Sequence, residues 1–583
     1  MTKSRAFSLR RASRVTPLAA TAWLLAAACG NGASPDADVG TRGGTAGAGT
    51  AGSAPGGTPA TGGATSAGGT GGTGGADSGG TTIGGNGAGG AGGASAGAGT
   101  AGAGQNAGGA SGIGGSAGND AGRGGMVGGD AGVAGGGMGG KGAAGMGGAG
   151  GSSGGGFPEN PTPVVLTDDA GYCWFEDPRA LFHGERLIVG SVASGFSSPA
   201  RRGDIEAVVY DVATSRASVF ELHNQLELDD HDSAAFLARP DGKLLAVYAK
   251  HDGENRFYYR VSSSDTLLAW GAERTFTPTS ATRVTYANLF LLTAENDRIY
   301  DFYRGLDGSF KPSYAYSDDG GETWRSGNVV IDVPSTQRHR PYVRYVGNGT
   351  DTIHLVYTEA HPRDFDNSLY HVYYRGGSLY RSNGTSIRTL AQGLSSPDEG
   401  TRIYQGNRDN VAWCADAAID ASGRPVAAYS VQVGSGGLPT GQGGDDIRYR
   451  YARWDGSAWR DYALAYAGSR LYAGEDDYSG LVAIDPADVN TVFISTNSNP
   501  STGAPLMSAA DGARHYEIFR GTTANGGQTW QWTPVTRDSR VDNLRPIVPR
   551  PSQAGRRALI WLRGTYRSYT DYQQELVAVF WNH

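Results

Sequence analysis

Cysteine is scarce in this chain, which has only Cys29, Cys173 and Cys414 among its 583 residues. So few thiols cannot build a disulfide framework, and a small disulfide-stapled fold is therefore excluded. Cys173 and Cys414 could form one disulfide or remain two buried thiols, and the sequence leaves both alternatives open.

Basic clusters and long apolar runs are also missing. The net charge is −7 and no run of Lys and Arg stands out, which argues against nucleic acid as a partner. Beyond the N-terminal region, no apolar run reaches membrane-spanning length. Helical periodicity is hard to find after residue 160, whereas short apolar and alternating runs are frequent. The sequence therefore predicts an all-β protein.

The N-terminus has the pattern of an export signal. Residues 1–29 contain five Lys/Arg, then an apolar stretch, then small residues before Cys29. Small residues directly before a cysteine resemble a bacterial lipobox, in which the cysteine is acylated and tethers the protein to a membrane. Ala26 stands where that pattern usually has Leu, so cleavage without a lipid is the alternative. We expect an exported protein: an outer-membrane or cell-surface lipoprotein anchored through Cys29, or a secreted protein.

Glycine is abundant instead, with 96 residues, many of them in residues 30–156. This segment is nearly all Gly, Ala, Ser and Thr, so it cannot bury enough apolar surface to offset the entropy of ordering. We predict a disordered linker, with a mean reach of roughly 60 Å for a random coil of this length. The folded domain is predicted to cover residues 157–583, and we expect it to be a monomer.

One unit recurs seven times in the predicted domain: a polar turn followed by a short apolar strand. The copies are residues 184–192, 241–250, 296–305, 350–359, 422–431, 488–497 and 555–564. A second repeat, the Asp-box SDDGGETW (317–324), has a near copy in TANGGQTW (523–530) and a degenerate one in DGSAW (455–459). Such turns join outer strands of propeller blades. We predict a seven-bladed β-propeller.

Polar residues at the ends of inner strands are the candidates for chemistry, because propeller loops converge on the central axis. They include His231, His251, Tyr286, Arg304, Arg340, Tyr342, His361 and Arg545. Together His, Tyr and Arg suit β-elimination from a uronate-containing polysaccharide. An Arg stabilises the enolate-like charge beside the carboxylate, and His or Tyr moves the protons.

From about Tyr172 to Phe580 the chain resembles the large BNR-repeat propeller family that includes the ulvan lyases of polysaccharide lyase families 24 and 25. The matching stretches include DDHDSAAF, VYAKH, TYANLF, DFYRG, SDDGGETW and RGTYRSYTDY. In those lyases two histidines about twenty residues apart, a tyrosine, and an arginine some sixteen residues beyond it form the active centre.

The resemblance implies a catalytic set of His231, His251, Tyr286 and Arg304, with Tyr342 as a further contact. Arg304 would neutralise the uronate, Tyr286 and His231 would share the base and acid roles, and His251 would orient a partner or bind sugar. Tyr286 and Arg304 are eighteen residues apart here, which departs from the family pattern. Arg340, His361 and Arg545 remain candidates for binding the substrate.

Each candidate also has a structural interpretation. His231 could cap a strand or pair with Asp229 or Asp230, and Arg304 could pair with Asp301 or Asp318. The late run 563–572 could simply close the ring, with the last strands completing a blade begun by the first. No potential ligands have zinc-like spacing, so no cofactor is required, and a structural metal ion stays an open alternative.

Three functions compete. The first is a lyase acting on an anionic polysaccharide such as ulvan. The second is a propeller that binds glycan without cleaving it. The third is a sialidase-like glycoside hydrolase, which needs three arginines around a carboxylate, here drawn from Arg304, Arg340 and Arg545. The third ranks last because the early Arg-Ile-Pro signature of that family is absent and the histidine pair would have no role.

Overall fold

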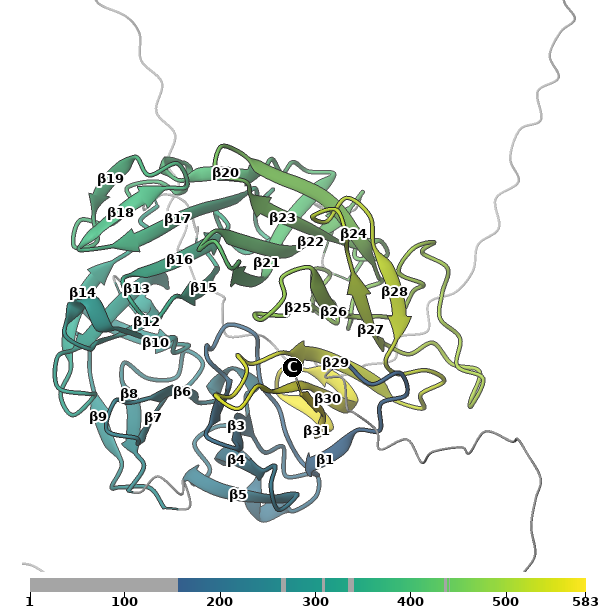
Figure 1. Cartoon of the computed structure of the whole chain (residues 1–583), viewed down its shortest axis with the longest axis horizontal. Helices are drawn as coiled ribbons and strands as arrows, with labels where there is room; N and C mark the ends of the chain where they lie inside the picture. The colour runs from purple at the N-terminus through teal and green to yellow at the C-terminus, as the bar shows by residue number, and fades with distance from the viewer. Residues whose placement is uncertain are drawn as a thin grey trace, which may run out of the picture. The chain divides into compact units, whose positions relative to one another are not determined.

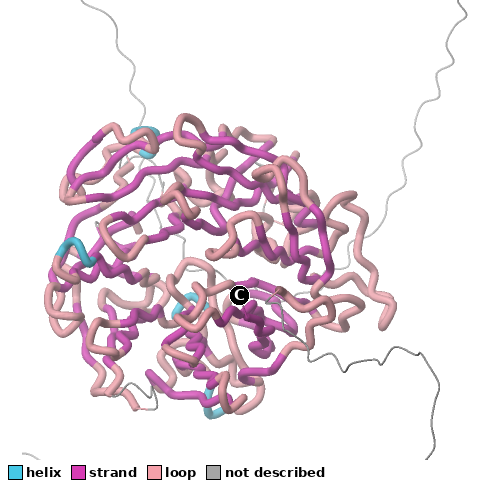
Figure 2. The backbone as a smooth tube through the Cα atoms, in the orientation of Figure 1, coloured by secondary structure: helices cyan, strands magenta, loops and turns pink. Residues whose placement is uncertain are grey.

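The computed structural model of the chain describes residues 156–263, 269–306, 310–333, 340–434, 438–439 and 441–582. Within them, strands form seven antiparallel sheets around an axis (Figure 1). Figure 2 shows strands and loops with only short helical turns between them. The predicted seven-bladed propeller is confirmed. The predicted signal segment with Cys29, and the predicted linker apart from Gly156, lie outside the described residues.

We name the blades A to G in chain order. Blade A contains β2 (Ala180–His183), β3 (Arg186–Val192), β4 (Ile205–Asp211) and β5 (Arg216–His223). Blade B contains β6 (Ala235–Ala238), β7 (Leu244–Tyr248), β8 (Phe257–Val261) and β9 (Arg274–Phe276). Blade C contains β10 (Ala281–Thr285), β11 (Leu289–Leu292), β12 (Arg298–Leu306), β13 (Lys311–Ser317) and β14 (Arg325–Val329).

The second half of the ring follows the same plan. Blade D contains β15 (Val343–Gly347), β16 (Thr352–Tyr357), β17 (Leu369–Arg375), β18 (Ser378–Arg381), β19 (Ser386–Thr389) and β20 (Thr401–Tyr404). Blade E contains β21 (Asn410–Ile419), β22 (Pro425–Val433), β23 (Ile447–Trp454) and β24 (Trp459–Gly468). Blade F contains β25 (Val482–Ile484), β26 (Thr491–Thr496), β27 (Glu517–Thr522) and β28 (Gln531–Pro534).

Blade G joins the two ends of the domain. It contains β29 (Asp542–Ile547), β30 (Arg556–Ser568), β31 (Asp571–Asn582) and, at its edge, β1 (Val164–Thr167). β1 pairs antiparallel with β31, with Val164 opposite Ala578. The last strands therefore complete a blade with the first strand, as predicted, and the ring cannot open without breaking this sheet.

The only helices among the described residues are four 3₁₀ turns: η1 (Pro199–Arg201), η2 (Asp230–Asp232), η3 (Thr293–Glu295) and η4 (Pro397–Glu399). None of the helices in this part of the chain is long and apolar enough to cross a membrane. One of them, η2, carries His231.

The Asp-boxes form turns between outer strands, as predicted. Between β13 and β14, Asp319 accepts hydrogen bonds from the backbone and hydroxyl of Thr323, and Ser317 Oγ accepts from Gly321 N at 2.8 Å. Gly320 and Gly321 have φ of 75° and 87°, which favour glycine. In the copy between β27 and β28, Asn525 Oδ1 accepts from Thr529 N at 3.0 Å. The Asn therefore replaces the Asp without loss of the turn.

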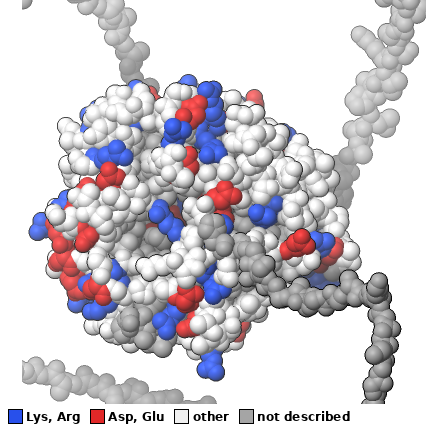
Figure 3. Space-filling model, in the orientation of Figure 1, with Lys and Arg blue, Asp and Glu red and all other residues white. Residues whose placement is uncertain are grey.

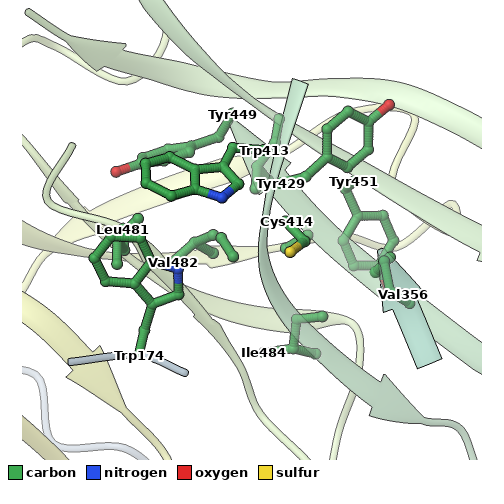
Figure 4. Packing of buried hydrophobic residues seen from close by; sticks show 14 of the residues in the cluster. Trp174, Val356, Trp413, Cys414, Tyr429, Tyr449, Tyr451, Leu481, Val482 and Ile484 are labelled. Atoms are coloured by element: carbon green, nitrogen blue, oxygen red, sulfur yellow. The ribbon is translucent and has the colours of Figure 1, made fainter. Parts of the chain in front are cut away.

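An aromatic segment crosses the axis and fills its centre. Trp174 lies edge-on to Trp413 and Tyr478, with ring centroids 5.2 and 5.0 Å apart. Phe175 packs on Tyr342 at 4.9 Å. Figure 4 shows Trp174 facing Trp413, with Leu481 close beside it. Since these rings come from blades D to F and from the segment before blade A, they hold distant parts of the ring together.

Cys173 and Cys414 are buried and unpaired, which decides between the two alternatives that the sequence left open. Cys173 lies in the aromatic segment and Cys414 in β21, the inner strand of blade E. The carboxyl-terminal halves of the inner strands enclose an axial cavity of about 760 Å³. The face shown in Figure 3 is hollowed near its centre, with side chains of both charges around the hollow.

Candidate active site

Three consecutive blades present polar side chains at equivalent positions. His231, Tyr286 and Tyr342 come shortly before the inner strands β6, β11 and β15. His251 and His361 follow β7 and β16, the strands paired with β6 and β15, and Arg304 lies in the last part of β12, which pairs with β11. Because the amino ends of the inner strands meet at one mouth of the ring, these side chains gather there.

One carboxylate holds both histidines. Asp229 Oδ1 accepts a hydrogen bond from His231 Nδ1 at 2.6 Å, and its Oδ2 accepts from His251 Nδ1 at 2.9 Å. The two imidazole rings stack, with centroids 3.9 Å apart and planes 14° from parallel. Since a carboxylate only accepts, each Nδ1 carries a proton and a neutral ring leaves Nε2 as its free base. The twenty-residue spacing therefore marks one histidine pair.

The two histidines differ in exposure and charge. The His231 side chain is 3% exposed and that of His251 is 26% exposed. Burial disfavours the charged form of His231, but Cys173 and Asp229 raise its pKa well above the usual value. Burial and then the charge of His231 lower the pKa of His251. Near neutral pH the pair is therefore one imidazolium and one neutral, reachable imidazole.

Tyr286 and Arg304 complete the predicted set. The Tyr286 ring lies 5.7 Å from His231 and 6.0 Å from His251. Arg304 donates from Nη1 to Tyr286 Oη at 3.3 Å. Tyr286 has a φ of 65°, a strained conformation for a bulky side chain that is often found at functional sites. Burial raises its pKa well above the usual value, so its hydroxyl stays protonated.

Arg304 is buried without a carboxylate partner among the described residues. It is 5% exposed, and its guanidinium lies over Tyr342 at 4.3 Å and Tyr286 at 5.1 Å from the ring centroids. The structure therefore does not form the pair with Asp301 or Asp318 that would have made Arg304 structural. A buried cation held only by aromatic faces and hydrogen bonds is suited to receive an anionic ligand.

A second group of polar side chains lies beyond Tyr342. The His361 ring is 5.4 Å from Tyr342, and Glu475 forms an ion pair with Arg363. Burial, with the charges of Arg363, Arg340 and Arg304, lowers the pKa of His361 well below its usual value. Burial also raises the pKa of Glu475 to about 7. His361 thus lies beside Tyr342, and Arg340 is one of the charges that lower the pKa of His361.

Arg545 has a different place. Its Nη1 bonds to Asp230 Oδ2 at 2.6 Å and its Nη2 to Tyr566 Oη at 2.7 Å, and it is 2% exposed. It ties blade G to η2 and so supports the loop that carries His231. The three arginines that a sialidase-like site would need, Arg304, Arg340 and Arg545, are therefore not all available to one ligand.

Replacing Arg545 by Met is expected to lower the free energy of unfolding by about 3–5 kcal/mol, because the buried Asp230 carboxylate loses its guanidinium partner and keeps only His231 and Tyr566 among the described side chains. Denaturant unfolding of the full chain measures this. The exposed Arg540 provides the matched control variant, Arg540→Met. Equal stability of the two variants would contradict the structural role of Arg545.

Two side chains complete the site: Asp229, and Tyr569, which the sequence offered only as part of the late run 563–572. Asp229 had been considered only as a structural partner of His231. Tyr569, at the tip of the β30–β31 hairpin, lies edge-on to both histidines, at 5.3 Å from His231 and 5.8 Å from His251. Its carbonyl accepts from Asp230 N at 2.9 Å. The late run therefore closes the ring and also covers the histidine pair.

Two groups of side chains bring potential metal ligands within 4.8 Å of one another: Cys173, Asp230 and His231, and Asp229, His231 and His251. In the second group both Asp229 oxygens already accept histidine protons. In the first, Asp230 Oδ2 accepts from Arg545 and Tyr566. We therefore assign these residues to a hydrogen-bond network.

Comparison with known proteins agrees with this fold. Residues 200–467 match the model of the BNR repeat-containing family. The matched residues run from blade A to blade E of the propeller. None of the curated proteins matches the sequence.

Solved structures share the architecture of this propeller. A PL25 ulvan lyase bound to -[GlcA(1-4)Rha3S]- is 14% identical, with 72% of this chain and 96% of that chain covered and a TM-score of 0.53. A structure of a PL25 ulvan lyase without the sugar is also 14% identical, with the same coverage of both chains and a TM-score of 0.52. An α-L-arabinanase of Penicillium chrysogenum with arabinobiose is 12% identical, covering 72% and 99%, with a TM-score of 0.38. At such identities the first two show a common fold.

Proposed function

We propose that the protein is a polysaccharide lyase that cleaves a uronate-containing anionic polysaccharide, of the ulvan type, by β-elimination. The observation that carries this proposal is the buried Arg304, which has no carboxylate partner among the described residues and lies beside Tyr286 and the Asp229-held histidine pair. A site with one unpaired cation and two proton-transfer groups fits the needs of that reaction.

Arg304 would bind the uronate carboxylate. As the C5 proton leaves, charge accumulates on that carboxylate, and a guanidinium fixed in a water-poor site stabilises it more than bulk water does. The imidazolium of His231 adds a second positive charge nearby. Tyr342, which stacks on Arg304, and Arg340 would contact the neighbouring sugar.

The geometry favours His251 as the base and Tyr286 as the acid. His251 Nε2 would take the C5 proton, the C4–O bond would break as the C4=C5 double bond forms, and Tyr286 would give its proton to the leaving oxygen. His251 is the exposed, neutral member of the pair. The raised pKa of Tyr286 keeps it protonated, as an acid must be. This differs from the expectation drawn from the family, in which Tyr286 and His231 share the base and acid roles and His251 orients a partner or binds sugar.

The direct test is to mix the purified full chain with ulvan and a panel of other uronate polymers and to follow ultraviolet absorbance. Absorbance from an unsaturated uronate is expected to rise. New reducing ends without that absorbance would indicate a glycoside hydrolase instead. Binding without either product would indicate a glycan-binding propeller.

The pH dependence of kcat/KM is expected to have its acidic limb below pH 6.5, the ordinary pKa of histidine. His251 must be neutral to act as the base. Because its pKa is lowered, it stays neutral to lower pH than an ordinary histidine, and activity is lost as the pH falls through this lowered pKa. In His231→Gln the neighbouring positive charge is gone, so the limb should move to higher pH. A limb that does not move would contradict the assignment of His251 as the base.

We also propose that the propeller is exported and held at a membrane through a lipid on Cys29. The signal-like residues 1–29 support this proposal. Metabolic labelling with a fatty acid, compared between the full chain and Cys29→Ala, tests it. Equal labelling of both would leave secretion without an anchor as the better description.

A further inference from the structure

A groove lies on the outer side of the ring, lined by residues of β18 and β20 of blade D and of the β23–β24 turn of blade E. Figure 1 shows where these strands lie in the ring. The volume of the groove is about 440 Å³. We call it the rim groove, and its principal lining side chains are Arg381, Asn383, Thr401, Arg402, Trp454 and Trp459.

The rim groove carries positive charge that no described carboxylate neutralises. Arg381 and Arg402 are exposed, and neither forms an ion pair with any carboxylate in the part of the chain that the structure describes. Arg381 donates Nε to the carbonyl oxygen of Glu399 at 2.8 Å, which holds its guanidinium at the groove.

The acidic side chains nearest in sequence are already occupied. The Glu399 carboxylate bonds to Arg388 at 2.7 Å and to Ser395 at 2.6 Å. Asp455 bonds to Arg460 at 2.7 Å. The two arginines of the rim groove therefore remain available for sulfate or carboxylate groups of a ligand.

The groove also has a fixed aromatic surface. Trp459 is half-buried, and its Nε1 donates to Ser382 Oγ at 2.9 Å, which sets the orientation of the indole. Trp454 lies 6.1 Å from it, with ring planes 56° apart. An immobilised indole offers an apolar face on which a sugar ring can stack at little entropic cost. Guanidinium groups beside an indole suit a sugar that carries an anionic group.

We infer that the rim groove binds a segment of an anionic polysaccharide, as a site separate from the histidine centre. The central site lies at the mouth of the ring in blades B to D, whereas the rim groove lies between the outer strands of blades D and E. A polymer held at the rim raises the local concentration of cleavable residues at the centre. The choice of ulvan as ligand rests on the proposed function, but binding at the rim does not require cleavage.

The test is affinity electrophoresis of the full chain through gels containing ulvan, in an Arg304→Ala background that removes cleavage. The double replacement Arg381→Ala/Arg402→Ala in that background is expected to weaken retardation about five- to tenfold, because two charge-assisted contacts are lost. Arg216→Ala/Arg325→Ala removes two exposed arginines from blades A and C and serves as the charge-matched control.

A second measurement separates this inference from the proposed function. With Arg304 intact, Arg381→Ala/Arg402→Ala should raise KM for the polymer and leave kcat/KM for a short oligosaccharide unchanged. If the chain cleaves nothing, loss of retardation in the rim variant alone still supports the rim site. Retardation equal to that of the Arg216→Ala/Arg325→Ala control would overturn it.

Discussion

Replacing Arg304 by alanine is expected to lower kcat/KM on a uronate polymer by about 10²–10³-fold, a size typical of removing one electrostatic stabiliser of the transition state. The guanidinium is 5% exposed and has no acidic partner among the described residues. Removing the guanidinium therefore removes the positive charge that would bind the ligand carboxylate, and it leaves no carboxylate among the described residues without its partner. Ultraviolet absorbance of the unsaturated product measures the effect.

Two further variants make the result specific. Arg304→Lys keeps the positive charge but loses the planar guanidinium and its stacking on Tyr342. Its kcat/KM should therefore lie between those of the wild type and Arg304→Ala. Arg298→Ala changes a partly exposed arginine at the start of the same strand, β12, which pairs with Asp318, and this variant should retain activity. If Arg304→Ala cleaves as fast as Arg298→Ala, the proposed anion site is wrong.

The sequence was most informative where the fold repeats. Each apolar run after a Gly, Asp or Asn turn became a strand of a blade, and both Asp-boxes became turns between outer strands. Such features depend on neighbouring residues only, because alternation and turn chemistry are local. The closure of the ring by β1 and β31 was predictable for a different reason, since a propeller must pair its two ends.

The candidate site could be predicted only in part. His231, His251, Tyr286 and Arg304 end or precede recognisable strands, so their convergence followed from the propeller geometry. The place of Tyr569 could not be predicted in this way. Its contact with the histidines joins blade G to blade B, and no local sequence pattern indicates such a long-range contact.

Arg545 shows the opposite limit of sequence reasoning. It lies on the inner strand β29, close to where the candidate residues His231 and Tyr286 precede their own inner strands, yet its guanidinium is already bound by Asp230 and Tyr566. The sequence gives the position of a charged side chain in a blade. Whether that side chain can bind a ligand depends on the partners that closure of the ring brings to it. For Arg545 one of these partners, Asp230, comes from the other end of the domain.

Asp229 is the residue whose role the structure changes most, and Asp229→Asn is expected to lower kcat/KM by about 10³–10⁴-fold, as when the carboxylate that orients a catalytic histidine is lost. An Asn side chain has one acceptor oxygen and one donor nitrogen, so it can accept from only one of the two Nδ1 atoms. The other histidine must turn or change tautomer, which moves its proton to Nε2 and removes the free base.

The pH profile distinguishes this positioning role from a merely structural one. Asp229 is among the charges that raise the pKa of His231, so in Asp229→Asn the imidazolium of His231 should be lost at lower pH. The alkaline limb of kcat/KM should therefore move downward, while KM changes less than kcat. Asp211→Asn, at a surface pair with Arg186, is the matched control and should keep both limbs. If Asp229→Asn kept the wild-type profile with normal kcat, the histidine pair would not be the proton-transfer centre, and the glycan-binding hypothesis would gain.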